Sequence, residues 1–129
     1  MTITEFLLAR IAEDEATASQ RIDREVSLMR RDGLPDTTRD NLPASWRRPL
    51  AECEAKRRIV ELHPIYHEGP RLLDVGIPNG VALGGCETCH SVDRINADAP
   101  IEAIGPCDTL CVLASVYADH PGFDQAWKV

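Results

Sequence analysis

The sequence predicts a mainly α-helical fold of three helices, one of them long and N-terminal, with a small β-hairpin or knuckle insertion. Two stretches with helical spacing of apolar residues, separated by proline-rich and glycine-rich segments, indicate the first helices. Four of the five cysteines lie between Cys86 and Cys111, at a spacing typical of a tetrahedral Zn²⁺ site. We therefore expect residues 1–129 to form a single helical domain stabilised by structural zinc.

The first predicted helix covers residues 2–32. Thr2 and Glu5 have the spacing of a capping box, and Gly33 with Pro35 supplies a stop. Such a helix is about 45 Å long at 1.5 Å per residue, so part of it either projects onto a partner or simply spans the domain. Its apolar stripe consists of Leu7, Ile11, Ala18, Ile22, Val26 and Met29.

The second predicted helix begins between Ser45 and Pro49, after a loop at residues 34–44. It runs to about His63, where Pro64 ends it. Ser45 is a suitable N-cap, and Pro49 is tolerated only near the first turn. Cys53 lies in mid-helix, away from the other cysteines, and we interpret it as a small buried hydrophobic residue.

The sequence after the second helix predicts a β-hairpin and a short third helix. Residues 72–77 and 81–83 flank a Pro-Asn-Gly turn and read as two short strands. The third helix is expected over residues 107–119, with Leu110, Leu113, Val116 and Tyr117 available to the core. Phe123 and Trp127 are expected to fold back as a tail.

The cysteine spacing predicts how a metal would be bound. Cys86 and Cys89 follow a pair of glycines and read as a tight turn. Cys107 and Cys111 are four residues apart at a helix start, hence on one face, where the positive end of the helix dipole stabilises thiolates. Spacing alone therefore favours Cys111 as the fourth ligand of a closed zinc site.

Other cysteine chemistries fit less well. Residues 86–90 match the Cys-x-x-Cys-His haem attachment pattern, but attachment needs export and the chain shows no signal peptide. A thioredoxin-like pair would need a helix directly after it. A zinc deaminase needs Pro-Cys-x-x-Cys, and Pro106-Cys107 is followed by Cys111, one residue too far. No general base or nucleophile stands out, so we predict a protein without enzymatic activity.

Charge and hydropathy limit the partners and the compartment. The net charge of −7 argues against sequence-blind nucleic-acid binding and against an anionic membrane surface. No apolar run reaches membrane-spanning length, and we expect a cytoplasmic protein. In a reducing compartment clustered cysteines favour metal binding over disulfides, and the odd total of five cysteines agrees with this.

Several segments together resemble a known family. These are residues 8–15, 54–63, 106–110 and 117–123, with the Cys86-x2-Cys89 pair. They resemble an uncharacterised family of small proteins from actinobacteria and their phages. The resemblance covers most of the chain apart from residues 33–44, 65–85 and 91–105, and it implies no activity.

The resemblance also bears on the zinc ligands. It implies Cys86, Cys89, Cys107 and a histidine at the position of His63, whereas the position of Cys111 is usually not cysteine in that family. The expected ligand set is therefore Cys86, Cys89, Cys107 and His63. Cys111 remains the alternative that spacing favours, and His90 and His120 are further alternatives.

The leading functional hypothesis is a non-enzymatic, zinc-stabilised module that binds another protein. The resemblance suggests a phage-encoded factor that engages a host protein in the host cytoplasm, with the long first helix and its acidic face as the contact surface. The alternative is a zinc-knuckle protein that binds nucleic acid through basic residues of the second helix. These basic residues are Arg47, Arg48, Lys56, Arg57 and Arg58. A third hypothesis is an enzyme with an open zinc position.

Overall fold

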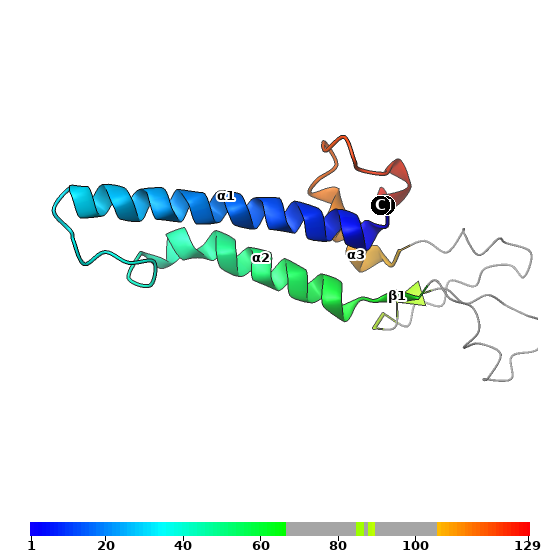
Figure 1. Ribbon diagram of the computed structural model, residues 1–129. Coiled ribbons are helices and arrows are strands. Elements are labelled where there is room, and N and C mark those ends of the chain that lie inside the picture. The colour runs from blue at the N-terminus through cyan, green and yellow to red at the C-terminus, as the bar shows by residue number, and fades with distance from the viewer. Residues whose placement is uncertain (67–84, 87, 90–105) are drawn as a thin grey trace, which may run out of the picture. The chain divides into compact units, whose positions relative to one another are not determined.

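The three predicted helices are present in a computed structural model of the protein (Figure 1), which describes residues 1–66, 85–86, 88–89 and 106–129. The described residues divide into two compact units, one formed by Met1–Leu7 with Val60–Val129 and the other by Leu8–Ile59. The expectation of a single domain stays a prediction. The elements are α1 (Ile3–Arg31), α2 (Ala44–Leu62), β1 (Ile65–Tyr66), β2 (Gly85–Cys86), α3 (Asp108–Ser115) and the 3₁₀ helix η3 (Gln125–Trp127).

Both ends of α1 carry the caps that the sequence predicted. The main-chain amide of Thr2 donates to the Glu5 carboxylate at 2.7 Å, and the Glu5 amide donates to the Thr2 hydroxyl at 3.2 Å. At the other end Gly33 has a φ of 100°, a conformation that favours glycine. The Leu34 amide then reaches back to the Met29 carbonyl at 3.0 Å, which closes the helix with a Schellman-type turn.

Helices α1 and α2 run side by side in opposite directions within the unit Leu8–Ile59 (Figure 1). Their shared core is small. Ile22, Val26 and Leu42 are buried, and Met29, Trp46 and Leu50 pack against them. Ion pairs add to this packing at the surface, where each contributes little. They join Asp14 to Lys56 at 3.5 Å, Glu15 to Arg57 at 2.5 Å and Asp23 to Arg39 at 2.7 Å.

The start of α2 differs from the prediction. The helix begins at Ala44, so Ser45 lies inside it and is not its N-cap, and Pro49 lies in the second turn. The Trp46 amide bonds to the Pro43 carbonyl at 2.9 Å, which closes the first turn earlier than expected. Because Pro49 has no amide hydrogen, the Ser45 carbonyl loses its usual intrahelical donor. The helix tolerates this loss near its exposed N-terminal end.

Helix α3 is shorter than predicted and ends at Ser115 instead of residue 119. Beyond it the Tyr117 amide bonds to Ala114 at 2.9 Å and the Ala118 amide to Ser115 at 3.2 Å. These hydrogen bonds join residues three apart instead of four, so the α-helix ends here and tighter turns follow. Val116 is 64% exposed, so the prediction that it joins the core was wrong.

The predicted folding back of the C-terminal tail is confirmed, and Phe6 is its anchor. Phe6 is 1% exposed, and its ring centroid lies 5.1 Å from Trp127 and 6.1 Å from Phe123. Tyr117 and His120 meet the same ring edge-on, at 6.3 and 5.7 Å. Aromatic rings prefer such tilted contacts, because the positive edge of one ring meets the negative face of another. This cluster attaches the first turn of α1 to the C-terminal tail.

The β structure in the described part of the chain is one antiparallel pairing. Ile65 of β1 faces Cys86 of β2, and Tyr66 faces Gly85. The predicted strands at 72–77 and 81–83 lie outside the described residues, so the β-hairpin insertion is not supported. The observed pairing nevertheless brings Cys86 beside the segment that follows α2. Among the described helices, none is both long and apolar enough to span a membrane.

Candidate metal centre

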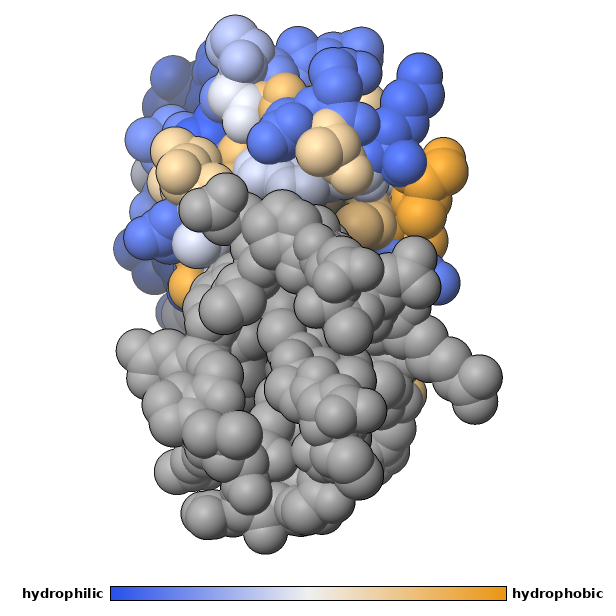
Figure 2. All heavy atoms as spheres, turned by 90° about the vertical axis from the view of Figure 1, so that its right-hand side faces the viewer, coloured by the Kyte–Doolittle hydropathy of each residue, from blue (hydrophilic) through white to orange (hydrophobic). Residues whose placement is uncertain are grey.

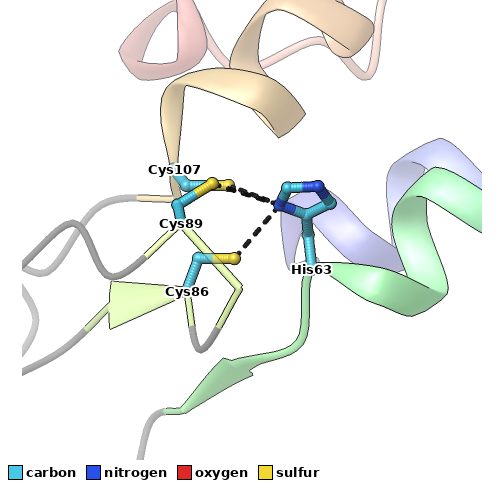
Figure 3. Close-up of side chains that lie close together, drawn as sticks. All are labelled: His63, Cys86, Cys89 and Cys107. Atoms are coloured by element: carbon cyan, nitrogen blue, oxygen red, sulfur yellow. Dashed lines mark hydrogen bonds between the residues drawn. The ribbon is translucent and has the colours of Figure 1, made fainter.

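Four predicted ligand residues come together in the unit that contains Val60–Val129 (Figure 3). His63 follows the end of α2 directly, and Cys86 is the second residue of β2. Cys89 lies in the turn after β2, and Cys107 immediately precedes α3. Because Ile65 pairs with Cys86, the short ladder fixes the distance between the histidine and the first cysteine. Three separate segments of the chain thus meet at one point.

The ligand atoms converge closely. The four atoms, one imidazole nitrogen and three sulfurs, all lie within 4.8 Å of one another. His63 Nδ1 is 3.1 Å from Cys86 Sγ, 3.2 Å from Cys89 Sγ and 3.7 Å from Cys107 Sγ (Figure 3). This cluster of one nitrogen and three sulfurs could hold a metal ion.

Hydrogen bonding alone does not account for this arrangement. A ring nitrogen has either one hydrogen or one lone pair, so it can make one good hydrogen bond in one direction. Here three sulfurs surround the His63 Nδ1 atom. A tetrahedral ion with Zn–S bonds of about 2.3 Å and a Zn–N bond of about 2.0 Å has N–S edges of about 3.5 Å. The observed distances of 3.1 to 3.7 Å are close to those edges.

The electrostatics of the cluster favour a cation. Burial raises the pKa of the Cys86 thiol, but hydrogen bonds from the main-chain amides of Cys89 and Thr88 outweigh it, and the net shift is downward. For Cys107, burial raises the thiol pKa to about 12; the Leu110 amide opposes this, and the neighbouring Cys86 and Cys89 thiols add to it. Several thiolates cannot share this small volume unless a positive charge sits among them.

Two threonines support the cluster, and sequence reasoning missed both. The Thr109 hydroxyl lies 3.6 Å from Cys89 Sγ, close enough for a hydrogen bond to sulfur. The Thr88 hydroxyl, inside the Cys86–Cys89 turn, donates to the main-chain carbonyl of Leu62. Groups of this kind orient metal ligands and hold them in place. In the sequence, the only indication of such a supporting residue was the position of Thr88 between Cys86 and Cys89.

Cys111, which spacing favoured, lies outside the cluster. The spacing argument placed Cys107 within the helix, but Cys107 is the N-cap, with an extended backbone of φ −66° and ψ 155°. The Cys107 side chain therefore does not lie on the same face of α3 as Cys111. Cys111 is buried, with Sγ 3.7 Å from the Pro106 carbonyl, and burial raises its thiol pKa. The Cys111 thiol is thus a protonated, packed side chain.

The other candidate residues are placed as follows. His120 packs edge-on against Phe6 and accepts a hydrogen bond from the Gly122 amide at 2.9 Å, so it belongs to the aromatic cluster. His90 lies outside the described residues. Cys53 is buried in the other unit, and burial together with the nearby Asp14 raises its pKa, as expected for an inert thiol.

The basic residues of α2 are mostly engaged with carboxylates. Lys56 pairs with Asp14, Arg57 with Glu15, and Arg48 with Glu52 at 3.5 Å. Nucleic-acid binding depends on cations that are available to neutralise phosphates. The paired cations of α2 are therefore poorly suited to the alternative function.

Comparison with known proteins identifies a family whose function is unknown. Residues 1–129 match the model of a family of unknown function, DUF6221. No curated protein and no solved structure matches the chain. The chemistry of the site is therefore the basis for any functional conclusion.

Proposed function

Because the chain belongs to the DUF6221 family, whose function is unknown, we propose its function from the metal centre itself. The protein is a non-enzymatic protein-interaction module whose fold is stabilised by a structural Zn²⁺ ion. His63 Nδ1 and the sulfurs of Cys86, Cys89 and Cys107 are the ligands. The observation that carries the proposal is the convergence of three sulfurs within 3.1 to 3.7 Å of one ring nitrogen.

The donor set supports zinc over other metals. Three thiolates and one imidazole are soft and borderline ligands, which suit Zn²⁺ and exclude Mg²⁺ and Ca²⁺, ions that prefer oxygen. Four protein ligands also complete a tetrahedron, whereas catalytic zinc keeps one position for water. The ion therefore stabilises the fold and leaves no position for a substrate.

A zinc ion at this point would link three segments that are distant in sequence. It would hold the end of α2, the turn after β2 and the start of α3 in one arrangement. The chain is only 5% aromatic, and four of its six aromatic side chains already form the Phe6 cluster. Metal binding contributes directly to folding in small domains with limited cores.

The proposed partner is another protein. The net charge of −7 and the pairing of Lys56 and Arg57 disfavour nucleic acid. The carboxylates of Asp14 and Glu15 on α1 are engaged in those same pairs, so the acidic face is a weaker contact surface than the sequence suggested. If the chain is phage-encoded, as the family resemblance suggests, its partner would be a host protein in the host cytoplasm.

Helix α3 offers a better contact surface. Val112 and Val116 are four residues apart on one face of the chain and are 58% and 64% exposed. On the face shown in Figure 2 the described surface is mostly hydrophilic, with separate apolar spots. Val112 lies within α3 and Val116 directly follows it, so a zinc ion that fixes the start of α3 would let both side chains enter a partner at low entropic cost.

Metal analysis with matched variants tests the zinc site. The wild type and Cys111→Ser are expected to bind one zinc per chain, and His63→Ala and Cys107→Ser are expected to lose it. Substitution by Co²⁺ should give the intense visible bands of a tetrahedral thiolate site in the wild type and in Cys111→Ser. Zinc retained by both ligand variants, or lost only in Cys111→Ser, would contradict the proposed ligands.

Binding experiments test the partner class. Cross-linking in a host lysate should yield a specific protein adduct that Val112→Asp and Val116→Asp remove while zinc content stays unchanged. Retardation of DNA or RNA by the zinc-loaded protein at low salt would overturn the choice of partner. Hydrolytic activity that depends on zinc would overturn the non-enzymatic assignment.

A further inference from the structure

A groove with a volume of about 560 Å³ lies between α1 and α2 in the unit Leu8–Ile59. Residues from one face of each helix line it, so it follows the hairpin axis for several turns. The metal centre contributes none of its lining. The lining residues are Asp14, Thr17, Ala18 and Arg21 from α1, and Ser45, Trp46, Pro49, Glu52, Cys53 and Lys56 from α2.

The groove lies where small or polar residues interrupt the apolar packing of the two helices. The apolar stripe of α1 has large side chains at Ile22 and Val26, but it is interrupted by Asp14 and has only a methyl group at Ala18. Opposite this interruption α2 presents Cys53. Small or polar residues on both helices leave a depression that adjacent helices would otherwise fill with interlocking side chains. A surface of this kind can receive side chains from outside the hairpin.

The charges around the groove balance. Asp14 and Glu52 supply two carboxylates, and Arg21 and Lys56 supply two cations. The whole chain carries −7, so two copies repel one another over most approaches. A locally neutral surface with both signs is where two like-charged copies can meet. Two-fold association requires such self-complementarity, because the same patch is used on both sides.

Arg21 supplies a more specific indication. Among the described residues it makes no ion pair or hydrogen bond, and its side chain is exposed at the groove. Within the described part of the chain, the one ion pair of Glu52 is a surface pair at 3.5 Å with Arg48, on its own helix. Arginine prefers a bidentate carboxylate partner, and Glu52 of a second copy has the matching charge.

We propose that two copies of this chain associate groove to groove through α1 and α2. Half-buried Ala18, Trp46 and Pro49 form the apolar centre, and Arg21 of each copy pairs with Glu52 of the other at the rim. The result is a bundle of four helices, two from each copy. This inference goes beyond the proposed function and is independent of the metal centre.

Sedimentation velocity over a range of protein concentrations tests the association. The wild type is expected to reach twice the chain mass of 14.3 kDa. Ala18→Arg places a long charged side chain in the groove and should weaken association at least about tenfold. The control is Ala16→Arg, the same change at an exposed α1 position outside the lining, which should associate like the wild type. Zinc content and helical circular dichroism verify that both variants are folded.

Charge exchange tests the rim pairs. Arg21→Glu and Glu52→Arg should each weaken association, and the double variant should recover most of the loss because the pairs are restored with reversed sign. A wild type that stays monomeric at all concentrations, or an Ala18→Arg variant that dimerises normally, overturns the proposal. A double variant no better than either single variant overturns the Arg21–Glu52 pairing.

Discussion

The Thr88 hydroxyl donates a hydrogen bond to the main-chain carbonyl of Leu62, the last residue of α2. Thr88 lies between Cys86 and Cys89, and Leu62 immediately precedes His63. One bond therefore connects the turn that carries two thiols to the helix end that carries the imidazole. It also gives an acceptor at the helix C-terminus a donor that the helix itself cannot supply. This hydrogen bond thus helps to align the cluster of His63 with Cys86, Cys89 and Cys107.

Thr88→Val should weaken zinc binding without removing a ligand. The change keeps the side-chain shape and deletes the hydroxyl, so His63 and the cysteine turn lose their link. Outer-shell changes of this type cost about 10- to 100-fold in metal affinity. Competition with a chromogenic chelator measures the effect, with Thr17→Val as control in the other unit. Thr88→Ser should restore affinity, and an unchanged affinity in Thr88→Val would refute the role assigned to the hydroxyl.

Phe6→Ala should destabilise the protein by about 3 to 5 kcal/mol, the range for deleting a buried phenylalanine ring. Phe6 is 1% exposed and contacts four other rings, so the cavity cannot close easily. Urea unfolding followed by tryptophan fluorescence measures the loss, since Trp127 reports directly on this cluster. Val116→Ala, at a 64% exposed position, should change stability by less than about 0.5 kcal/mol. A similar cost for both variants would show that the cluster is not a core.

Zinc binding should release protons, and its affinity should rise with pH. Burial raises the pKa of Cys107 to about 12 in the metal-free protein, so this thiol is protonated at neutral pH and must lose its proton to coordinate zinc. Lowering the pH increases proton competition and weakens binding; raising it does the reverse. Isothermal titration calorimetry in buffers of different ionisation enthalpy counts the protons released. Binding that is independent of buffer and pH would contradict thiolate coordination.

Removing the metal should loosen one unit more than the other. After chelation the amides of Leu110 and Cys111, which bond to the Cys107 carbonyl at 3.0 and 3.1 Å, should exchange hydrogen faster. Amides near Ile22 and Val26, in the core of the other unit, should keep their protection. Hydrogen exchange with mass spectrometry resolves the two regions, and the Cys111→Ser variant serves as a metal-binding control. Equal loss of protection in both units would contradict a local stabilising role of zinc.

The features predicted best are those that depend on neighbours in sequence. The Thr2–Glu5 capping box and the stop at Gly33 both follow from residues within one helical turn, and the structure shows both. The predicted end of α3 was wrong. Apolar residues continue the helical spacing up to Tyr117, but the main-chain hydrogen bonds after Ser115 no longer join residues four apart. The start of α2 was misplaced because Ser45 resembles a cap, yet the first turn closes on Pro43.

The sequence alone determined the three helices and the cysteine-rich segment in which a metal would be bound, because these follow from local periodicity and residue type. Only the tertiary structure decided which side chains meet, since His63 lies 23 residues from Cys86 and 44 from Cys107 along the chain. The β1–β2 pairing and the extended backbone at Cys107 set those distances, and they leave Cys111 packed away from the cluster. Contacts between distant residues depend on how the elements pack, which spacing along the chain does not specify.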